Sequence, residues 1–164
     1  MPRLPDHPLP AAVQPCSTLP DAMPACVLVA IPTQYLASVL PMLPTGVAAV
    51  LCCQGIERQT LAFPPDILAR ERSDVPGAVL CGPNFAREIA AGLPAAAVLA
   101  APEQSRAQAL SSLLSTSLFR LYASTDCVGV QLGAAAKNVI AVASGVTIGA
   151  GLGENARAAL ITRG

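Results

Sequence analysis

Short apolar runs alternate along this chain with longer segments in which the apolar residues recur at helical spacing. The short runs are rich in β-branched residues and end at proline, glycine or a polar pair, a pattern typical of strands buried on both faces of a sheet. The expected strands are residues 26–31, 47–53, 77–82, 95–101 and 118–122, and the expected helices between them are residues 33–43, 65–72, 84–92 and 103–115. This order predicts an α/β sheet with helices on both faces.

The pattern changes after Tyr122. Residues 124–151 contain no strand punctuation and indicate one long helix of small residues, which Ser124 or Thr125 can cap, with Asp126 in its positive first turn. A second helix begins within residues 151–164. We therefore expect two domains, a sheet domain over residues 1–123 and the beginning of a helical domain over residues 124–164.

Three turn-forming segments follow the first three expected strands. They are residues 32–34, 54–57 and 82–84, and Thr33 in the first of them can also cap the following helix. In α/β sheets, ligands bind at the carboxyl ends of the strands. The sequence therefore predicts a binding site where these three turns lie together.

Composition and charge exclude several classes of protein. Apolar residues make up 53% of the chain and charged residues 12%, which predicts a buried globular core. The net charge is zero, so nothing favours nucleic acid or an anionic membrane surface as a partner. Six cysteines without a CxxC pair, and a single histidine, argue against zinc or another metal. The proline-rich start is no signal peptide, so we expect a cytoplasmic protein with reduced, mostly buried thiols.

Lys137 is the only lysine, and it lies in the most apolar segment of the chain. That segment, residues 127–153, is long enough to span a bilayer. A lysine within a span costs about 3 kcal/mol, and the segment is rich in Gly, Ala and Ser. We therefore favour a buried helix of a soluble protein over a membrane span.

Four segments together carry a resemblance to a known family. They are VLVAIPTQ (27–34), QGIE (54–57), CGPNFAREIAAGLP (81–94), and VGVQLGAAAKNVIAVASG with GLGENARAALITRG (128–164). In this order they resemble the bacterial-type NAD(P)-dependent glycerol-3-phosphate dehydrogenases. The resemblance implies a Rossmann-like dinucleotide-binding sheet, an all-helical substrate domain, and NAD or NADP as cofactor. It also implies hydride transfer between NAD(P)H and dihydroxyacetone phosphate, which gives sn-glycerol 3-phosphate for glycerophospholipid synthesis, and it allows a homodimer.

The resemblance assigns Lys137 the role of proton donor and acceptor at the C2 oxygen of the substrate. The chemistry agrees, because a ketone that accepts hydride develops alkoxide charge that an ammonium group can stabilise and protonate. The alternatives are a lysine that extends to the surface, an ordinary turn at residues 82–84 and a helix-packing role for Asn138. The implied substrate-binding residues are Gln54, Gly82, Asn84, Lys137 and Asn138, and the implied cofactor-binding residues are Pro32, Gln54 and Ala86.

The sequence departs from the family pattern in three places. Gln54 stands where the family has lysine, and the lost charge should weaken anion binding by about 1.5–3 kcal/mol. No strand–GxGxxG–helix fingerprint is present; the glycines at 149–153 follow a helix and indicate a helix-ending turn. The later helices of the family are also missing. These departures predict an internal piece with marginal stability or solubility.

Three competing interpretations remain. The chain is either a catalytic dehydrogenase or a non-catalytic remnant of one that acts at most as an interaction module. A third alternative, the wider β-hydroxyacid dehydrogenase group, shares the two-domain plan, but the ENARAALITRG segment favours a phosphate substrate.

Overall fold

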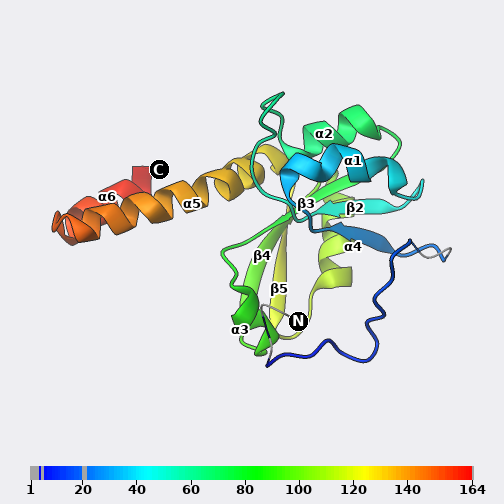
Figure 1. Cartoon of the computed structure of the whole chain (residues 1–164), viewed down its shortest axis with the longest axis horizontal. Coiled ribbons are helices and arrows are strands. Elements are labelled where there is room, and N and C mark those ends of the chain that lie inside the picture. Colours follow the sequence, from blue (N-terminus) through cyan, green and yellow to red (C-terminus); the bar gives the residue numbers. More distant parts are fainter. Residues whose placement is uncertain (1–3, 5, 20–21, 164) are drawn as a thin grey trace.

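A computed structural model describes residues 4, 6–19 and 22–163 of the chain. Its centre is a five-stranded sheet in which the strands lie side by side in sequence order (Figure 1). Strands β1, β2 and β3 are parallel, β4 runs antiparallel to β3, and β5 is parallel to β4. The strands are β1 (Cys26–Val29), β2 (Ala48–Leu51), β3 (Gly77–Cys81), β4 (Ala95–Ala100) and β5 (Phe119–Ser124). All five expected strands are confirmed.

The expected helices are also present, and one of them is broken. Residues 33–43 form η1 (Thr33–Tyr35), α1 (Leu36–Val39) and η2 (Leu40–Met42), with Pro41 in the first turn of η2. Proline lacks the N–H group that a continuous helix requires and clashes with the preceding turn. The remaining helices are α2 (Pro64–Glu71), α3 (Ala86–Ala90), α4 (Gln104–Leu114), α5 (Cys127–Gly149) and α6 (Gly153–Arg163).

Two hydrophobic clusters cover the two faces of the sheet. Leu51 packs with Ile67 of α2 on one face, whereas its neighbour Val50 packs with Ala107 and Leu110 of α4 on the other. Neighbouring residues of a strand point to opposite faces, so the apolar run of β2 serves both clusters. Each fully buried large aliphatic side chain contributes about 1.5–3 kcal/mol. The prediction of helices on both faces is confirmed.

The prediction that every strand is buried on both faces is wrong for β1. This strand lies at one edge of the sheet, and Leu28 is 51% exposed while Val29 is buried. A run of β-branched residues shows that a strand is apolar, but it does not show whether the strand lies at the centre or at an edge of the sheet. A sequence of this kind therefore fits an edge strand as well as a central one.

The connection from β3 to β4 is not a helical crossover. Helix α3 has five residues and none of them is buried, so it cannot cover a face of the sheet. Parallel strands need a crossover of a dozen or more residues that packs on the sheet. Here the chain turns back, and Leu80 pairs with Leu99 in an antiparallel ladder.

Helix α5 begins at a cap that differs from the predicted one. The N-cap is Asp126, whose Oδ1 accepts a hydrogen bond of 2.8 Å from the N–H of Gly129. Ser124 instead accepts from the N–H of Asp126 at 3.1 Å. A carboxylate at this position satisfies an unpaired N–H and also interacts favourably with the positive end of the helix.

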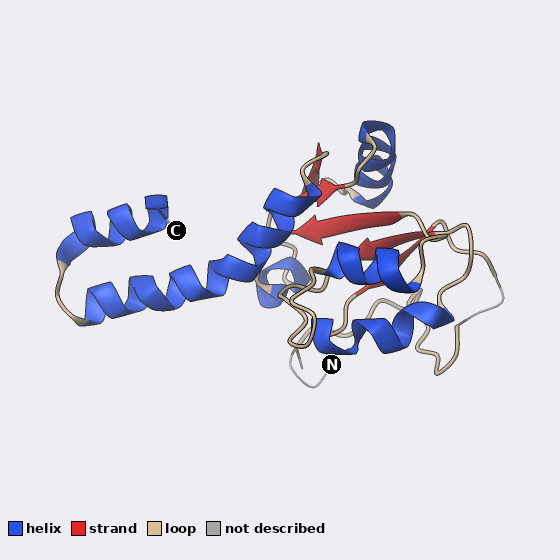
Figure 2. Ribbon diagram, turned by 90° about the horizontal axis from the view of Figure 1, so that it is seen from above, coloured by secondary structure: helices blue, strands red, loops and turns tan. Residues whose placement is uncertain are grey.

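The prediction that α5 is a buried helix is wrong. Figure 2 shows α5 and α6 as a hairpin that extends away from the sheet. Helix α5 is long and apolar enough to cross a membrane by length and composition, and only 11% of its apolar window is buried. The helix contacts β3 and β4 as well as α6, and the part that lies beside α6 is the one farther from the sheet (Figure 2). Apolar composition predicted burial, but among the described residues no further element covers the exposed side.

Candidate functional site

The loops after β1 and β2 are joined by side-chain hydrogen bonds. The hydroxyl of Thr33 donates to the carbonyl of Gln54 at 2.8 Å, and Thr33 is only 4% exposed. Thr33 therefore does not cap a helix as predicted; Pro32 occupies the N-cap position of η1 and has no side-chain donor or acceptor. The hydroxyl instead joins the loop after β1 to the loop after β2. This confirms that the first two predicted turns lie together, at the edge of the sheet formed by the carboxyl ends of the strands, which we call the rim.

The side chain of Gln34 makes two more bonds between the same loops. Its Nε2 donates to the carbonyl of Ile56 at 2.8 Å, and its Oε1 accepts from the N–H of Arg58 at 3.1 Å. Gly55 lies between the bonded carbonyls of Gln54 and Ile56 and has a φ of +113°, a conformation that residues with a side chain rarely adopt. Sequence reasoning missed Gln34 as a candidate, because a side chain that pairs with a distant backbone has no signature in the hydrophobic pattern.

Lys137 reaches the loop that follows β3. Its Nζ donates to the carbonyl of Gly82 at 3.4 Å, across 55 positions of the sequence, and the lysine is half-buried. The alternative of a lysine that extends freely into solvent is therefore not what the structure shows. Helix α5 contacts β3. Because Gly82 directly follows the last residue of β3, the bond to its carbonyl places the lysine ammonium at the carboxyl end of that strand.

Gly82 is confined by the neighbouring strand. A Cβ at this position would lie 2.7 Å from Nδ2 of Asn84, 2.8 Å from Cβ of Ala97 and 2.9 Å from the carbonyl of Ala96. Real Cβ atoms do not approach so closely, so the turn needs glycine even though its φ is not positive. The amide of Asn84 therefore lies next to Gly82, the residue whose carbonyl Lys137 contacts.

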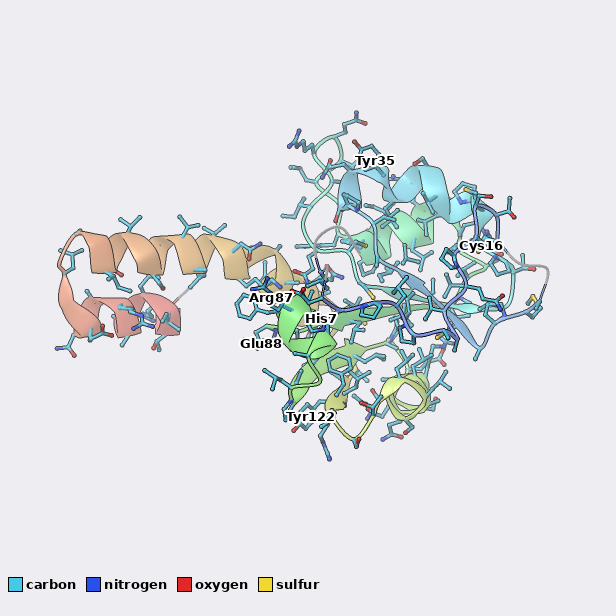
Figure 3. All side chains as sticks on the ribbon, turned by 60° about the horizontal axis from the view of Figure 1, so that its bottom comes forward. His7, Cys16, Tyr35, Arg87, Glu88 and Tyr122 are labelled. Carbon is cyan, nitrogen blue, oxygen red and sulfur yellow. The ribbon has the colours of Figure 1, made fainter. Side chains whose placement is uncertain are left out.

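The other predicted residues are less closely grouped. Ala86 is exposed at the start of the short helix α3. Figure 3 shows Arg87 and Glu88 of the same helix well apart from Tyr35, which lies in η1 next to Pro32. Of the three predicted cofactor residues, Pro32 and Ala86 therefore lie on separate parts of the rim, and Gln54 lies on the same part as Pro32.

Asn138 follows Lys137 but lies on another side of α5. It is exposed and lines a shallow apolar hollow with Val139, Val142 and Ala143. Successive residues of a helix are turned by about 100°, so adjacent side chains do not share a face. The structure does not bring Asn138 to the rim with Gly82 and Gln54.

The thiols and a carboxylate near the site have shifted pKa values. Burial raises the pKa of Cys81, which lies directly before Gly82, and the nearby Lys137 opposes that shift. Burial also raises the pKa of Cys53, next to Gln54, to about 11. In the β2 loop, hydrogen bonds from Thr60 and Arg70 lower the pKa of Glu57. Cys53 is therefore a neutral thiol and behaves as the small buried hydrophobe that the sequence predicted. The prediction that most of the thiols are buried is wrong for the other five cysteines: one is exposed and four are only partly buried (Cys16, and Cys26, Cys52, Cys81 and Cys127).

The glycine cluster at residues 149–153 joins α5 to α6, as expected. Gly151 and Gly153 have φ of +67° and +82° and form the turn of the helical hairpin. No strand precedes this turn, so it is not a pyrophosphate-binding loop. Among the described residues, the groups that suit a cofactor are the backbone and amides of the rim, with no glycine-rich turn for a pyrophosphate.

A Rossmann-like sheet with polar loops at the carboxyl ends of three parallel strands defines a nucleotide-binding class of protein. The comparisons with known proteins narrow this class. Residues 2–107 match the family described as NAD-dependent glycerol-3-phosphate dehydrogenase N-terminus, and residues 126–164 match the corresponding C-terminus. The chain belongs to the NAD-dependent glycerol-3-phosphate dehydrogenase family.

Individual relatives agree with the family. A glycerol-3-phosphate dehydrogenase [NAD(P)+] of Gluconobacter oxydans is 53% identical over 99% of this chain and 51% of its own length. One of Acidiphilium cryptum is 51% identical, over 99% of this chain and 50% of its own length. The crystal structure of a glycerol-3-phosphate dehydrogenase of Coxiella burnetii matches 98% of this chain and 51% of that one, with a TM-score of 0.84 and 31% identity. The chain spans about half the length of the curated relatives it matches.

Proposed function

We propose that the chain takes part in the interconversion of dihydroxyacetone phosphate and sn-glycerol 3-phosphate with NAD(P)H. Membership of the family supports this proposal. It is also supported by relatives named glycerol-3-phosphate dehydrogenase, which are similar to nearly the whole of this chain. The cofactor, NAD or NADP, supplies or receives the hydride when it is bound. The residues of this chain bind the substrate, orient it and move a proton.

One observation carries the proposal: the single lysine meets the rim of the sheet at Gly82. In the proposed role, the ammonium of Lys137 donates a proton to the C2 oxygen as alkoxide charge develops there, and the amine accepts it in the reverse direction. Arginine cannot do this, because it does not lose its proton in proteins. The carbonyl of Gly82 holds the ammonium group at the rim.

The neighbouring residues are proposed to bind the substrate. Gln54 and Asn84 offer amide donors beyond the carboxyl ends of β2 and β3, and Asn84 lies next to Gly82, which Lys137 contacts. Asn138 is retained as a proposed substrate contact from the resemblance, although the geometry gives it no support. Pro32, Gln54 and Ala86 are the proposed cofactor contacts, and the described residues offer no glycine-rich turn for the pyrophosphate.

The wider assignments follow from the same proposal. A product of this kind would serve glycerophospholipid synthesis, and the free cysteines support a reducing, cytoplasmic environment. The net charge of zero fits a small-molecule substrate better than nucleic acid. The separate family matches before residue 108 and after residue 125 support the proposed division into domains at residues 1–123 and 124–164. The exposed apolar side of α5 would suit a homodimer.

The test is the oxidation of NADH and of NADPH by the purified 164-residue chain in the presence of dihydroxyacetone phosphate. The matched control replaces this substrate with dihydroxyacetone, which lacks the phosphate group. The proposal predicts oxidation that depends on the phosphorylated ketone. A soluble, folded chain that oxidises neither cofactor with this substrate would overturn it, and would leave the remnant interpretation.

A further inference from the structure

We infer that Gln34 is a positioning residue, which fixes the β2–α2 loop (residues 52–63) so that Gln54 faces the substrate. The inference rests on the proposed function, because Gln54 is a proposed substrate contact. Nothing in the family match assigns this task to Gln34, and Gln34 itself does not touch the proposed reacting atoms.

The carboxamide of Gln34 forms two hydrogen bonds with the backbone of the loop, one as donor and one as acceptor, as the backbone of a neighbouring strand does. It donates to the carbonyl of Ile56 at 2.8 Å and accepts from the N–H of Arg58 at 3.1 Å, so both polar atoms of the amide are used. A side chain that satisfies a donor and an acceptor two residues apart fixes both the distance and the orientation of that backbone. Thr33, the preceding residue, adds the 2.8 Å bond to the carbonyl of Gln54.

The loop is fixed from its other side by different groups. Glu57 is buried, receives hydrogen bonds from Thr60 and Arg70, and its N–H donates to the carbonyl of Ala62 at 2.9 Å. These bonds stabilise the base of the loop and do not involve the loop after β1. Loss of the Gln34 bonds should therefore release the part around Gln54 without unfolding the loop as a whole.

The orientation of Gln54 depends on this contact because Gly55 follows it. Gly55 has a φ of +113°, and a Cβ there would meet only the hydroxyl of Thr33 at 3.9 Å. A glycine gives the backbone several accessible conformations. The bonds of Thr33 and Gln34 on either side of Gly55 select one of them, and this positions the preceding side chain.

The test compares the wild-type chain with Gln34→Ala and Gln34→Glu. The glutamate retains an acceptor for the N–H of Arg58 but cannot donate to the carbonyl of Ile56, so it separates the two bonds. Gln108→Ala is the matched control, since Gln108 is exposed on α4 and makes no side-chain hydrogen bond among the described residues. The measurements are hydrogen exchange of peptides covering residues 54–62, the affinity for dihydroxyacetone phosphate, and the steady-state constants.

Both Gln34 variants should exchange faster in residues 54–62 and bind dihydroxyacetone phosphate about tenfold more weakly, whereas Gln108→Ala should not. Because Gln34 acts through Gln54, KM should rise while kcat stays within about twofold. Faster exchange with unchanged affinity would show a structural role only and would overturn the inference. A wild-type chain that does not bind the ketone would refute the proposed function and the inference with it, whereas wild-type binding equal to that of the variants would refute the inference alone.

Discussion

Replacement of Gly82 by alanine tests whether the close approach of β3 and β4 creates the turn that Lys137 contacts. The added Cβ would lie 2.8 Å from Cβ of Ala97 and 2.9 Å from the carbonyl of Ala96. Carbon atoms in ordinary contact are about 3.5 Å or more apart, so the strand must move by roughly 0.7 Å. Insertion of a group into a closely packed site costs about 1–3 kcal/mol. We predict that Gly82→Ala lowers the free energy of unfolding by this amount.

The matched control is Gly145→Ala. Gly145 lies within α5, is exposed, and a Cβ there would meet no atom within 4 Å. Alanine is more favourable than glycine in a helix by about 0.5–1 kcal/mol, so this substitution should stabilise the chain slightly.

Urea denaturation followed by circular dichroism measures both variants against the wild type. The two substitutions add the same methyl group, and the structure predicts shifts of opposite sign. A Gly82→Ala variant within about 0.5 kcal/mol of the wild type, outside the range expected for overpacking, would refute the argument that Gly82 is sterically required.

Three further predictions concern a helix cap, a buried carboxylate and the missing charge at the rim. Asp126→Ala should cost about 0.5–2 kcal/mol in urea denaturation, because Asp126 caps α5, and Asp126→Asn should retain most of that stability. Hydrogen bonds from Thr60 and Arg70 hold the pKa of Glu57 below its ordinary value of 4.5. Its carboxylate therefore contributes stability at neutral pH that is lost as the pH falls below 4.5 through the lowered pKa of the folded state. Glu57→Gln should flatten the acid side of a plot of Tm against pH, and an unchanged acid side would contradict this. Gln54→Lys should lower the Kd for dihydroxyacetone phosphate about tenfold or more by adding a charge-assisted contact, measured by calorimetric titration.

The strands and most helices could be predicted from the sequence because local patterns determine them. The run at residues 47–53 has an apolar residue at nearly every position, and β2 indeed serves both faces of the sheet. Its bounds are Ala48–Leu51, so the strand is shorter at each end than the apolar run. Short apolar runs bounded by glycine and proline are sufficient for predictions of this kind.

The direction of β4 and the exposure of α5 could not be predicted in the same way. Residues 84–92 have helical spacing, but α3 contains only five residues and is too short to form a crossover that packs on the sheet. The spacing of apolar residues does not give the length of the helix. The apolar composition of α5 predicts that the helix packs against another element, but it does not identify that element. Both features depend on where elements lie in space, which periodicity along the chain does not encode.

The candidate site was predicted in part. The three turns were expected at one rim, and hydrogen bonds join two of them, while Lys137 reaches the third. The roles of Thr33 and Gln34 were missed because each bonds to backbone more than 20 positions away. The resemblance implied Asn138 beside Lys137, but adjacent residues of a helix place their side chains on different faces.

The central claim is that Lys137 is the proton donor and acceptor of a ketone reductase, and a comparison of two substitutions tests it most directly. The measurement is oxidation of NADH and NADPH with dihydroxyacetone phosphate by the wild type, Lys137→Ala and Lys137→Arg, each shown to be folded. The account predicts turnover by the wild type that falls by about 10²–10⁴-fold in both variants, because arginine keeps the charge but cannot release a proton. Turnover that survives in Lys137→Arg would contradict the proton-transfer role, and turnover that survives in Lys137→Ala would remove Lys137 from the site altogether.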